Sequence, residues 1–323
     1  MKNEIKYFYN LEPQTIINKK NYYFFIIDDC HYYLKIYNRN IEDINYLQQL
    51  NKNMLNTIIL SHEIILNKDK SLISLINNIP YYLFKTCINE KALIKLSDIS
   101  YLSNKKINYD SKLIKNTWPE LWSKKIDYLE RQVNEMGKKY PLLVESFNYF
   151  VGLAENAISY ATETINNVPK TVYDNSVITH IRIKKEDTLL EFYDTINLTI
   201  DHKARDVAEY IKTSFFKKNK YIFQELNEYF KHNIYSEYGI RMLLARLIYP
   251  SFYFDLYEDI ISGIQKETTI LTIISEINNY EIYLKQIFLY FKMFYNIPSI
   301  EWIIKKGWLI LIYYFNNFWN LIN

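Results

Sequence analysis

Two segments near the middle of the chain decide the fold. They read His180-Ile181-Arg182 and Thr199-Ile200-Asp201-His202-Lys203-Ala204-Arg205-Asp206-Val207-Ala208-Glu209-Tyr210. Asp201 follows a β-rich run, so we expect it at the end of a strand. Asp206 opens a run with helical character, and an acid at a helix start is favourable in itself. The chain therefore combines a histidine in a loop, an acid at a strand end and an acid at the start of a helix.

The order of these residues resembles the active site of kinases of the aminoglycoside and choline phosphotransferase type. In that family a loop that begins His-Gly-Asp supplies the catalytic base, and a strand-end Asp further along the chain holds the metal. Here Arg182 stands at the position of the base. Its guanidinium stays protonated at any accessible pH and cannot accept a proton from a substrate hydroxyl. The resemblance therefore implies a kinase-like fold without the ordinary catalytic base.

Four segments between residues 118 and 254 make the resemblance narrower. They are Trp118-Pro119-Glu120-Leu121-Trp122 with Asp127-Tyr128-Leu129-Glu130, Gly152 to Ile158, Asp201 to Tyr210, and Leu244 to Pro250 with Tyr253-Phe254. In content and order they resemble the YutH group of spore coat-associated proteins, a kinase-like family of spore-forming Firmicutes. The resemblance implies synthesis in the mother-cell cytoplasm, a location in the spore coat, and other coat proteins as partners.

The fold implied is α+β: a bilobal protein-kinase-like fold of the aminoglycoside phosphotransferase type, with a large, mostly helical C-terminal lobe. Residues 1–88 are expected to form a small β-rich lobe and residues 89–323 the helical one. Alternating and β-rich runs in the first lobe predict strands around one helix. The expected strands are 22–28, 31–37, 57–66, 71–76 and 79–84, and the expected helix is 41–55.

Helices dominate the second lobe. Apolar residues recur at spacings of three and four from Trp122 to Met136 and from Leu143 to Ala161, which predicts two helices that face a core. Further helices are expected near 205–216, 236–248, 252–264, 270–294 and 299–321, and β-like segments at 177–183 and 188–192. The apolar run from Trp308 to Phe315 is shorter than the ~20 residues that span a bilayer, so a buried terminal helix is expected there.

Two residues in the first lobe are candidates for a cofactor site. Lys35 lies on the strand 31–37, where the phosphate-contacting lysine of an active kinase-like enzyme would be. A solvent-facing strand lysine is the alternative interpretation. Glu42 is the natural acidic partner for Lys35, but at the start of a helix an acid also complements the helix dipole, which is the favoured interpretation.

Four residues of the central segments are assigned roles by the resemblance. Asp187 stands where a metal-binding Asn would be, although an acid in an exposed turn explains it better. Asp201 stands at the metal-binding position, and its carboxylate is expected to pair with Arg182 in place of a metal. Asp206 is expected to brace the loop by hydrogen bonds. His180 is expected to be a satisfied core residue and not a base.

The phosphate loop is missing its usual residue. Glycine lets a backbone approach phosphate oxygens and adopt positive φ, but the first glycine of this chain is Gly137. Residues 10–21 therefore cannot form an ordinary nucleotide-clasping loop. No cofactor is expected, with ATP and Mg²⁺ as the ligands of the alternative interpretations.

Composition excludes other classes of protein. The chain has 323 residues, a net charge of +3, and lysine pairs scattered along its length, which gives no support for nucleic-acid binding. Its two cysteines, Cys30 and Cys87, favour a reducing compartment and act as small apolar residues. The abundance of tyrosine, 32 residues, fits core and interface positions better than a role in cross-linking.

The resemblance implies a kinase-like protein of the spore coat that lacks catalysis and acts through protein–protein interaction in coat assembly. The first alternative is an active phosphotransferase that acts on a small hydroxyl substrate or a coat protein, with Lys35, Asp187 and Asp201 positioning Mg-nucleotide. The second is a scaffold that binds ATP without hydrolysing it. The missing base argues against the first alternative, although positioning alone can give some rate.

Overall fold

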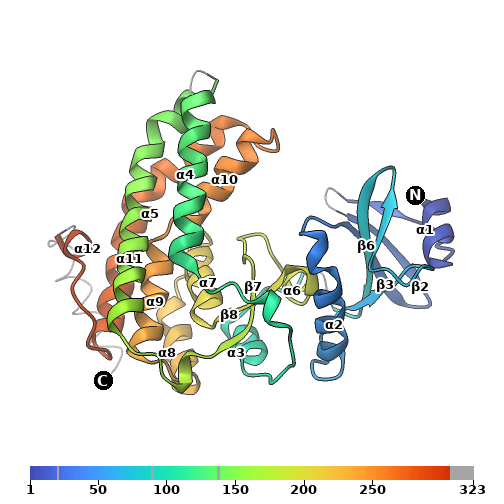
Figure 1. Cartoon of the computed structure of the whole chain (residues 1–323), viewed down its shortest axis with the longest axis horizontal. Helices are drawn as coiled ribbons and strands as arrows, with labels where there is room; N and C mark the ends of the chain where they lie inside the picture. The colour runs from blue at the N-terminus through green and yellow to red at the C-terminus, as the bar shows by residue number, and fades with distance from the viewer. Residues whose placement is uncertain (20–21, 89–90, 137–138, 306–323) are drawn as a thin grey trace. The chain divides into compact units, whose positions relative to one another are not determined.

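The computed structural model describes the chain except for residues 20–21, 89–90, 137–138 and 306–323 (Figure 1). The chain divides into two compact units, and each is described by itself. The first unit comprises residues 1–116, 176–206 and 225–229, and the second comprises 117–175, 207–224 and 230–323. The lobe boundary after residue 88 stays a prediction, because these units are divided elsewhere.

An antiparallel sheet forms the amino-terminal part of the first unit, as the sequence predicts. The strands run in the order β1-β2-β3-β6-β4, and β5 pairs with β6. Their bounds are β1 Ile17–Asn18, β2 Tyr22–Ile27, β3 Cys30–Ile36, β4 Glu63–Ile65, β5 Ile73–Ile76 and β6 Ile79–Thr86. The predicted strand at 57–66 is thus confirmed only over its last residues. The helix at 41–55 appears as the 3₁₀ turn η1, Ile41–Asp43, followed by α2, Ile44–Leu55.

Two tight hairpins are made without glycine. Asp28 and Asp29 connect β2 to β3, and Asn77 and Asn78 connect β5 to β6, all four with positive φ. A two-residue hairpin turn of type I′ requires positive φ at both central positions, and Asn and Asp tolerate this region better than other residues that have a side chain. The absence of glycine from this part of the chain therefore does not prevent the sheet from forming.

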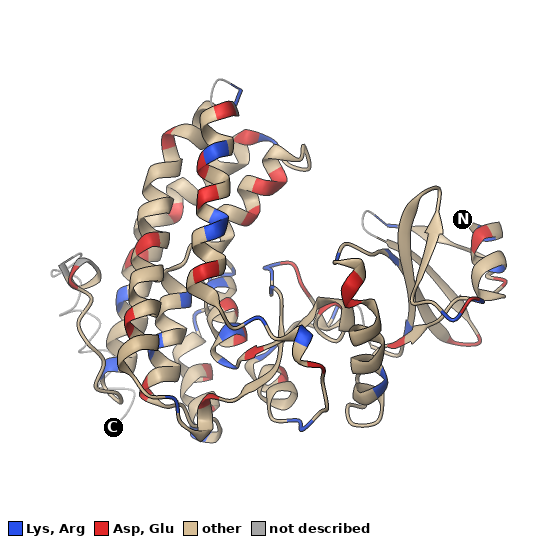
Figure 2. Ribbon diagram, viewed as in Figure 1, with Lys and Arg blue, Asp and Glu red and all other residues tan. Residues whose placement is uncertain are grey.

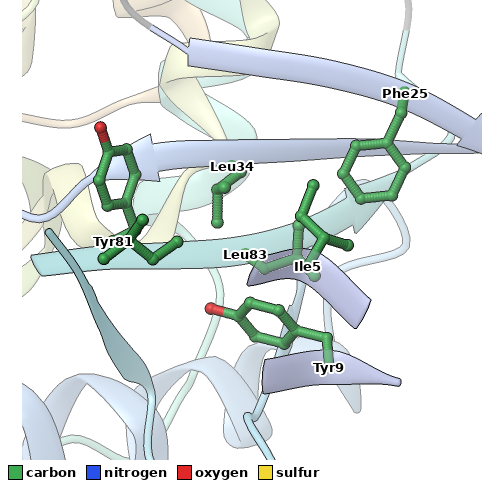
Figure 3. Packing of buried hydrophobic residues seen from close by; sticks show 7 residues of the cluster. Ile5, Tyr9, Phe25, Leu34, Tyr81 and Leu83 are labelled. Carbon is green, nitrogen blue, oxygen red and sulfur yellow. The ribbon is translucent and has the colours of Figure 1, made fainter. Parts of the chain in front are cut away.

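A helix that the sequence did not predict covers one face of the sheet. Helix α1, Lys2–Tyr9, buries Ile5 and Tyr9 against Phe25, Leu34 and Leu83 of the strands (Figures 1 and 3). The alternation of β2 and β3 places every second side chain on this face, which gives the sheet an apolar surface that the helix removes from water.

The central segments form a second, two-stranded sheet of β7, Ser176–His180, and β8, Leu198–His202. The β-like prediction for 188–192 is wrong, because this segment forms the short helix α6, Leu189–Phe192. Thr188 and Glu191 form a capping box: the Thr188 hydroxyl accepts from Leu190 N, and the Glu191 carboxylate accepts from Thr188 N. The cap thus satisfies the backbone N–H groups of Thr188 and Leu190 within the segment itself. In a strand, these groups would need a neighbouring strand as their partner.

The remaining helices agree with the predicted ones, except for α3 and α8, which the sequence did not predict. They are α3 Leu96–Ser103, α4 Trp118–Met136, α5 Pro141–Asn167, α7 Ala204–Phe216, α8 Ile222–His232, α9 Glu237–Ile248, α10 Ser251–Ile261, α11 Leu271–Lys292 and α12 Glu301–Lys305. In the second unit α5 lies beside both α4 and α9 (Figure 1).

The end of the expected helix at 299–321, with the apolar run Trp308 to Phe315, lies outside the described residues. Within the described part of the chain no helix is both long enough and apolar enough to span a membrane. Lys and Arg lie among Asp and Glu along α4 in Figure 2, as the scattered lysine pairs of the sequence predict.

We expect Leu34→Ala to lower the free energy of unfolding by about 3 kcal/mol, because Leu34 is fully buried and the substitution leaves a cavity under α1. Leu75→Ala in β5 is the matched control. Its side chain is 61% exposed, so the loss should stay within about 0.5 kcal/mol. Urea unfolding of the three proteins measures both values, and equal losses would contradict this account of the core.

Candidate functional site

His180 ends β7 with its ring buried between two acceptors. Its Nδ1 lies 2.7 Å from Oδ2 of Asp206, and its Nε2 lies 2.7 Å from the carbonyl oxygen of Phe192. A carboxylate and a carbonyl both accept, so both ring nitrogens must donate, and the ring is an imidazolium. Burial lowers the pKa of His180, but the charge and hydrogen bond of Asp206 outweigh burial and raise the pKa above its ordinary value. His180 is thus a buried cation and not a proton acceptor.

Asp206 holds the same loop from the start of α7. Its Oδ1 accepts from the backbone N of His180 at 2.9 Å, while Oδ2 pairs with the ring. Both residues are almost completely buried. These are the contacts expected of a residue that braces the loop, and the role itself stays a prediction.

Asp201, at the end of β8, is fully buried, and both of its carboxylate oxygens have protein partners. Oδ1 accepts from the backbone N of His202 at 2.7 Å, and Oδ2 accepts from Nη1 of Arg205 at 2.6 Å. A charged guanidinium therefore contacts the carboxylate that the resemblance assigns to a metal.

Arg205 joins Asp201 to the loop after β7. Its Nε donates to the carbonyl oxygen of His180 at 2.6 Å, and its Nη2 donates to that of Ile181 at 2.7 Å. Three nitrogens of one planar group thus hold the end of one strand and the beginning of the loop that follows the other. The sequence expected Arg182 to pair with Asp201. Arg205 forms such a pair, and the pairing of Arg182 itself stays a prediction.

Lys35 on β3 lies against two carboxylates. Its Nζ is 3.2 Å from Oδ2 of Asp194 and 3.6 Å from Oε1 of Glu191. The hydroxyl of Tyr82 donates to the same Asp194 oxygen at 2.6 Å. The Lys35 side chain is only 11% exposed, so the alternative of a solvent-facing lysine is wrong.

Aromatic rings line the face of the sheet from which Lys35 projects. The ring centroid of Phe84 lies 5.2 Å from the Lys35 ammonium, and that of Tyr22 lies 5.9 Å from it. Tyr33 stacks on Phe84 with centroids 5.3 Å apart, and both rings are fully buried. The ammonium is thus surrounded by carboxylates and ring faces, both of which attract a cation.

Glu42 is not the partner of Lys35. It is exposed in η1, where its carboxylate accepts from the side-chain amide of Asn40 at 3.2 Å. This agrees with the favoured interpretation of an acid that complements a helix start.

Asp187 lies in a turn. Its Oδ2 accepts from the backbone N of Lys184 at 2.6 Å, and burial raises the pKa of the carboxyl to about 6. Among the residues that the structure describes, no group of three or more His, Cys, Asp or Glu could hold a metal ion. With Asp201 bound to Arg205 and Lys35 bound to Asp194, the residues as arranged do not fit Mg-nucleotide.

Four residues of this site were missed from the sequence: Arg205, Glu191, Asp194 and His62. The His62 ring stacks on Phe84, and its Nε2 contacts the carbonyl oxygen of Leu190 at 2.8 Å. Burial lowers the pKa of His62 to about 4, so it is neutral beside the Lys35 cluster. Only Arg205 had a local signal, since it lies four residues after Asp201. Asp194 and His62 come to Lys35 from distant segments.

Comparison with known proteins gives a family. The model of a family described as "Spore coat putative kinase YutH" matches residues 2–287. The endospore coat-associated protein YutH of Bacillus subtilis (strain 168) is 32% identical over 155 residues. That match covers 44% of this chain and 45% of the relative, so it spans about half the length of the curated protein.

Two solved structures share the fold. An aminoglycoside phosphotransferase from Alicyclobacillus acidocaldarius has a TM-score of 0.59 at 10% identity, and the match covers 86% of this chain and 91% of that one. A spectinomycin phosphotransferase, solved with ADP and spectinomycin, has a TM-score of 0.55 at 13% identity, covering 88% and 92%. The predicted α+β fold of the aminoglycoside phosphotransferase type is thereby confirmed.

Arg205→Ala should lower the free energy of unfolding by about 3 kcal/mol, because the buried Asp201 carboxylate loses its ion pair and two carbonyl groups lose donors. Arg131→Ala, at an exposed position of α4, is the control and should change stability by less than about 0.5 kcal/mol. Chemical unfolding gives both numbers. Arg182→Ala in the same series tests the pairing expected for Arg182, and unchanged stability would remove it.

The His180–Asp206 pair should make stability depend on pH in one direction. Because the folded pKa of His180 is raised, its contribution is complete below the unfolded value of about 6.5 and is lost as pH rises through the folded pKa. The stability difference between the native protein and His180→Gln should therefore shrink from pH 6 towards alkaline pH. Urea unfolding across this range measures it, and a difference that grows with pH would contradict the imidazolium assignment.

Proposed function

This chain belongs to the YutH family of spore coat putative kinases, and from that membership we propose that it is a kinase-like protein without phosphotransferase activity. It acts by binding other proteins of the spore coat, where it resides after synthesis in the mother-cell cytoplasm. One observation carries the proposal. The strand-end carboxylate of Asp201 is buried, with Arg205 on one oxygen and a backbone amide on the other.

Metal binding is opposed by the charge of Arg205. In an active phosphotransferase the metal bridges the phosphates and a carboxylate, and it supplies the positive charge that the transferred group requires. Here a guanidinium contacts that carboxylate at 2.6 Å and also holds two carbonyl groups. A metal would have to displace a cation that is fixed by three hydrogen bonds, so Arg205 supports an inactive site.

Phosphate binding is opposed by the partners of Lys35. The ammonium would have to leave Asp194 and Glu191 to contact a nucleotide, and leaving Asp194 unpaired in a buried site carries a penalty. Tyr82 also donates to Asp194, so the carboxylate is fixed from two sides. Asp194 and Glu191 thus provide Lys35 with the negative charge that the phosphates of a nucleotide would provide in an active enzyme.

Proton transfer lacks a base. Arg182 cannot accept a proton, and His180 already has protons on both ring nitrogens. The description of the family as putative kinases favours the active phosphotransferase as the second candidate. That candidate requires a base outside the loop, together with release of both Lys35 and Asp201.

We expect the melting temperature of the purified protein to stay unchanged when Mg²⁺ with excess ATP or ADP is added. A ligand that binds only the folded state, at a concentration 100 times its Kd, stabilises the protein by about 2.7 kcal/mol. A change of this size is easily measured. The spectinomycin phosphotransferase with ADP is the positive control, since its solved structure contains ADP. A rise that Asp201→Asn abolishes would overturn the proposal and revive nucleotide binding.

Coat association should survive Asp201→Asn. The proposal assigns the function to surfaces that bind other proteins, and the substitution removes one charge inside the site while it keeps the shape of the side chain. A fluorescent fusion observed in spores measures the location, and circular dichroism of the purified variant shows whether it folds. Loss of coat location by a folded Asp201→Asn protein would show that the site itself is needed.

A further inference from the structure

The two cysteines, far apart in the sequence, lie at the same end of two paired strands. β3 and β6 pair without interruption from His31 with Thr86 to Ile36 with Tyr81. In every one of these pairs the two residue numbers add up to the same total. One step beyond His31 and Thr86, the same register would pair Cys30 with Cys87. Cys30 is the first residue of β3, and Cys87 directly follows the last residue of β6.

The opposite end of the ladder between β3 and β6 indicates whether this pair is hydrogen-bonded or non-hydrogen-bonded. Tyr37 N donates to the carbonyl oxygen of Pro80, its partner in the same register, so that pair is of the hydrogen-bonded kind. The two kinds alternate along an antiparallel ladder, and Cys30 is seven residues from Tyr37. Continued by one residue past Thr86, this register would make Cys30 and Cys87 a non-hydrogen-bonded pair, a geometry in which the Cα atoms lie about 4.5 Å apart and the side chains approach closely. This separation lies within the range that a disulfide requires, roughly 4.4 to 6.8 Å.

Both thiols are accessible, and the continued register would place them on one face of the sheet. Opposite residues of a ladder project from the same side of the sheet, the side of Tyr32 and Lys85. Cys87 is exposed and Cys30 is partly exposed, and both are free thiols in the structure. A small reagent can thus reach the pair without unfolding the sheet.

We propose that Cys30 and Cys87 are a cross-strand dithiol that a small-molecule disulfide oxidises to an intrachain disulfide bond. The Cys87 thiolate attacks one sulfur of oxidised glutathione, and one reduced glutathione leaves. The Cys30 thiolate then attacks the Cys87 sulfur of the mixed disulfide, and the second reduced glutathione leaves. The two cysteines lose two protons and two electrons, which the two glutathione molecules gain.

The bond would fasten the beginning of β3 to the end of β6. The segment that it closes includes α2, β4 and β5, so most of the sheet would lie within one covalent loop. Closing a loop of this length restricts the unfolded chain and leaves the folded sheet in its existing register. The protein would be a dithiol in reducing surroundings and would gain stability where oxidised glutathione is available.

The test is oxidation of the purified, fully reduced chain with oxidised glutathione, followed by maleimide quenching, intact-mass measurement and a non-reducing gel. We expect a monomer that has lost two hydrogen atoms and does not react with maleimide. Its melting temperature should exceed that of the reduced protein by roughly 5 °C or more, and dithiothreitol should reverse the change. Glutathione adducts on both cysteines, or disulfide-linked dimers in place of the bridged monomer, would overturn the proposal.

The matched control moves one thiol by a single residue. In Cys30→Ser combined with His31→Cys, the new thiol projects from the opposite face of the sheet, because successive side chains alternate. This variant should form glutathione adducts in place of the bridge. A bridge formed as readily as in the native chain would show that proximity does not depend on the register.

A second measurement keeps the proposal testable if that variant fails to fold. It is the equilibrium constant for formation of the bridge by oxidised glutathione, measured for the native sequence with and without guanidinium. This constant should be at least tenfold larger for the folded chain than for the unfolded chain. Equal formation in both states would remove the structural basis of the inference.

Discussion

The buried ion pair between His180 and Asp206 is the constraint on which the rest of the first unit depends. Each ring nitrogen of His180 meets an acceptor at 2.7 Å, so the ring must carry a positive charge within the protein. That charge is tolerable because Asp206 is fixed beside it and also accepts from the backbone of the same residue. The end of β7, helix α6 and the start of α7 are thereby joined at one point.

A second cation extends this constraint to β8. Arg205, one residue before Asp206, holds the carbonyl groups of His180 and Ile181 and the carboxylate of Asp201. Lys35 is held in a corresponding way by Asp194 and Glu191. The positive and negative charges that a phosphotransferase would leave for metal and phosphate are here matched by residues of the chain. The buried charges of this site are thus paired with one another within the chain.

Local patterns predicted much of the fold. Strand β3 and helices α4 and α5 each bury one face, so their apolar residues recur with the period of a strand or of a helix. This period can be recognised in the sequence alone. Helix α6 was mistaken for a strand because its four residues are too few to show a helical period, and its capping box decides the conformation. Helix α1 was missed because its apolar side consists mainly of Ile5 and Tyr9. Two apolar residues are too few to predict a helix, and they become buried only by packing against the sheet.

The sequence by itself determined that no glycine precedes Gly137, and that Arg182 and Asp201 stand at the positions that the resemblance assigns to the base and the metal ligand. These are statements about residue identity and order, and they need no coordinates. Only the tertiary structure decided which charges meet. Lys35 contacts Asp194, 159 residues away in the sequence, and the pairing of β3 with β6 brings Cys30 and Cys87 to the same end of the two strands. The physical reason is that a long-range pair depends on strand register and packing, both set by the whole chain, whereas a local pattern records only which face of its own element a residue occupies.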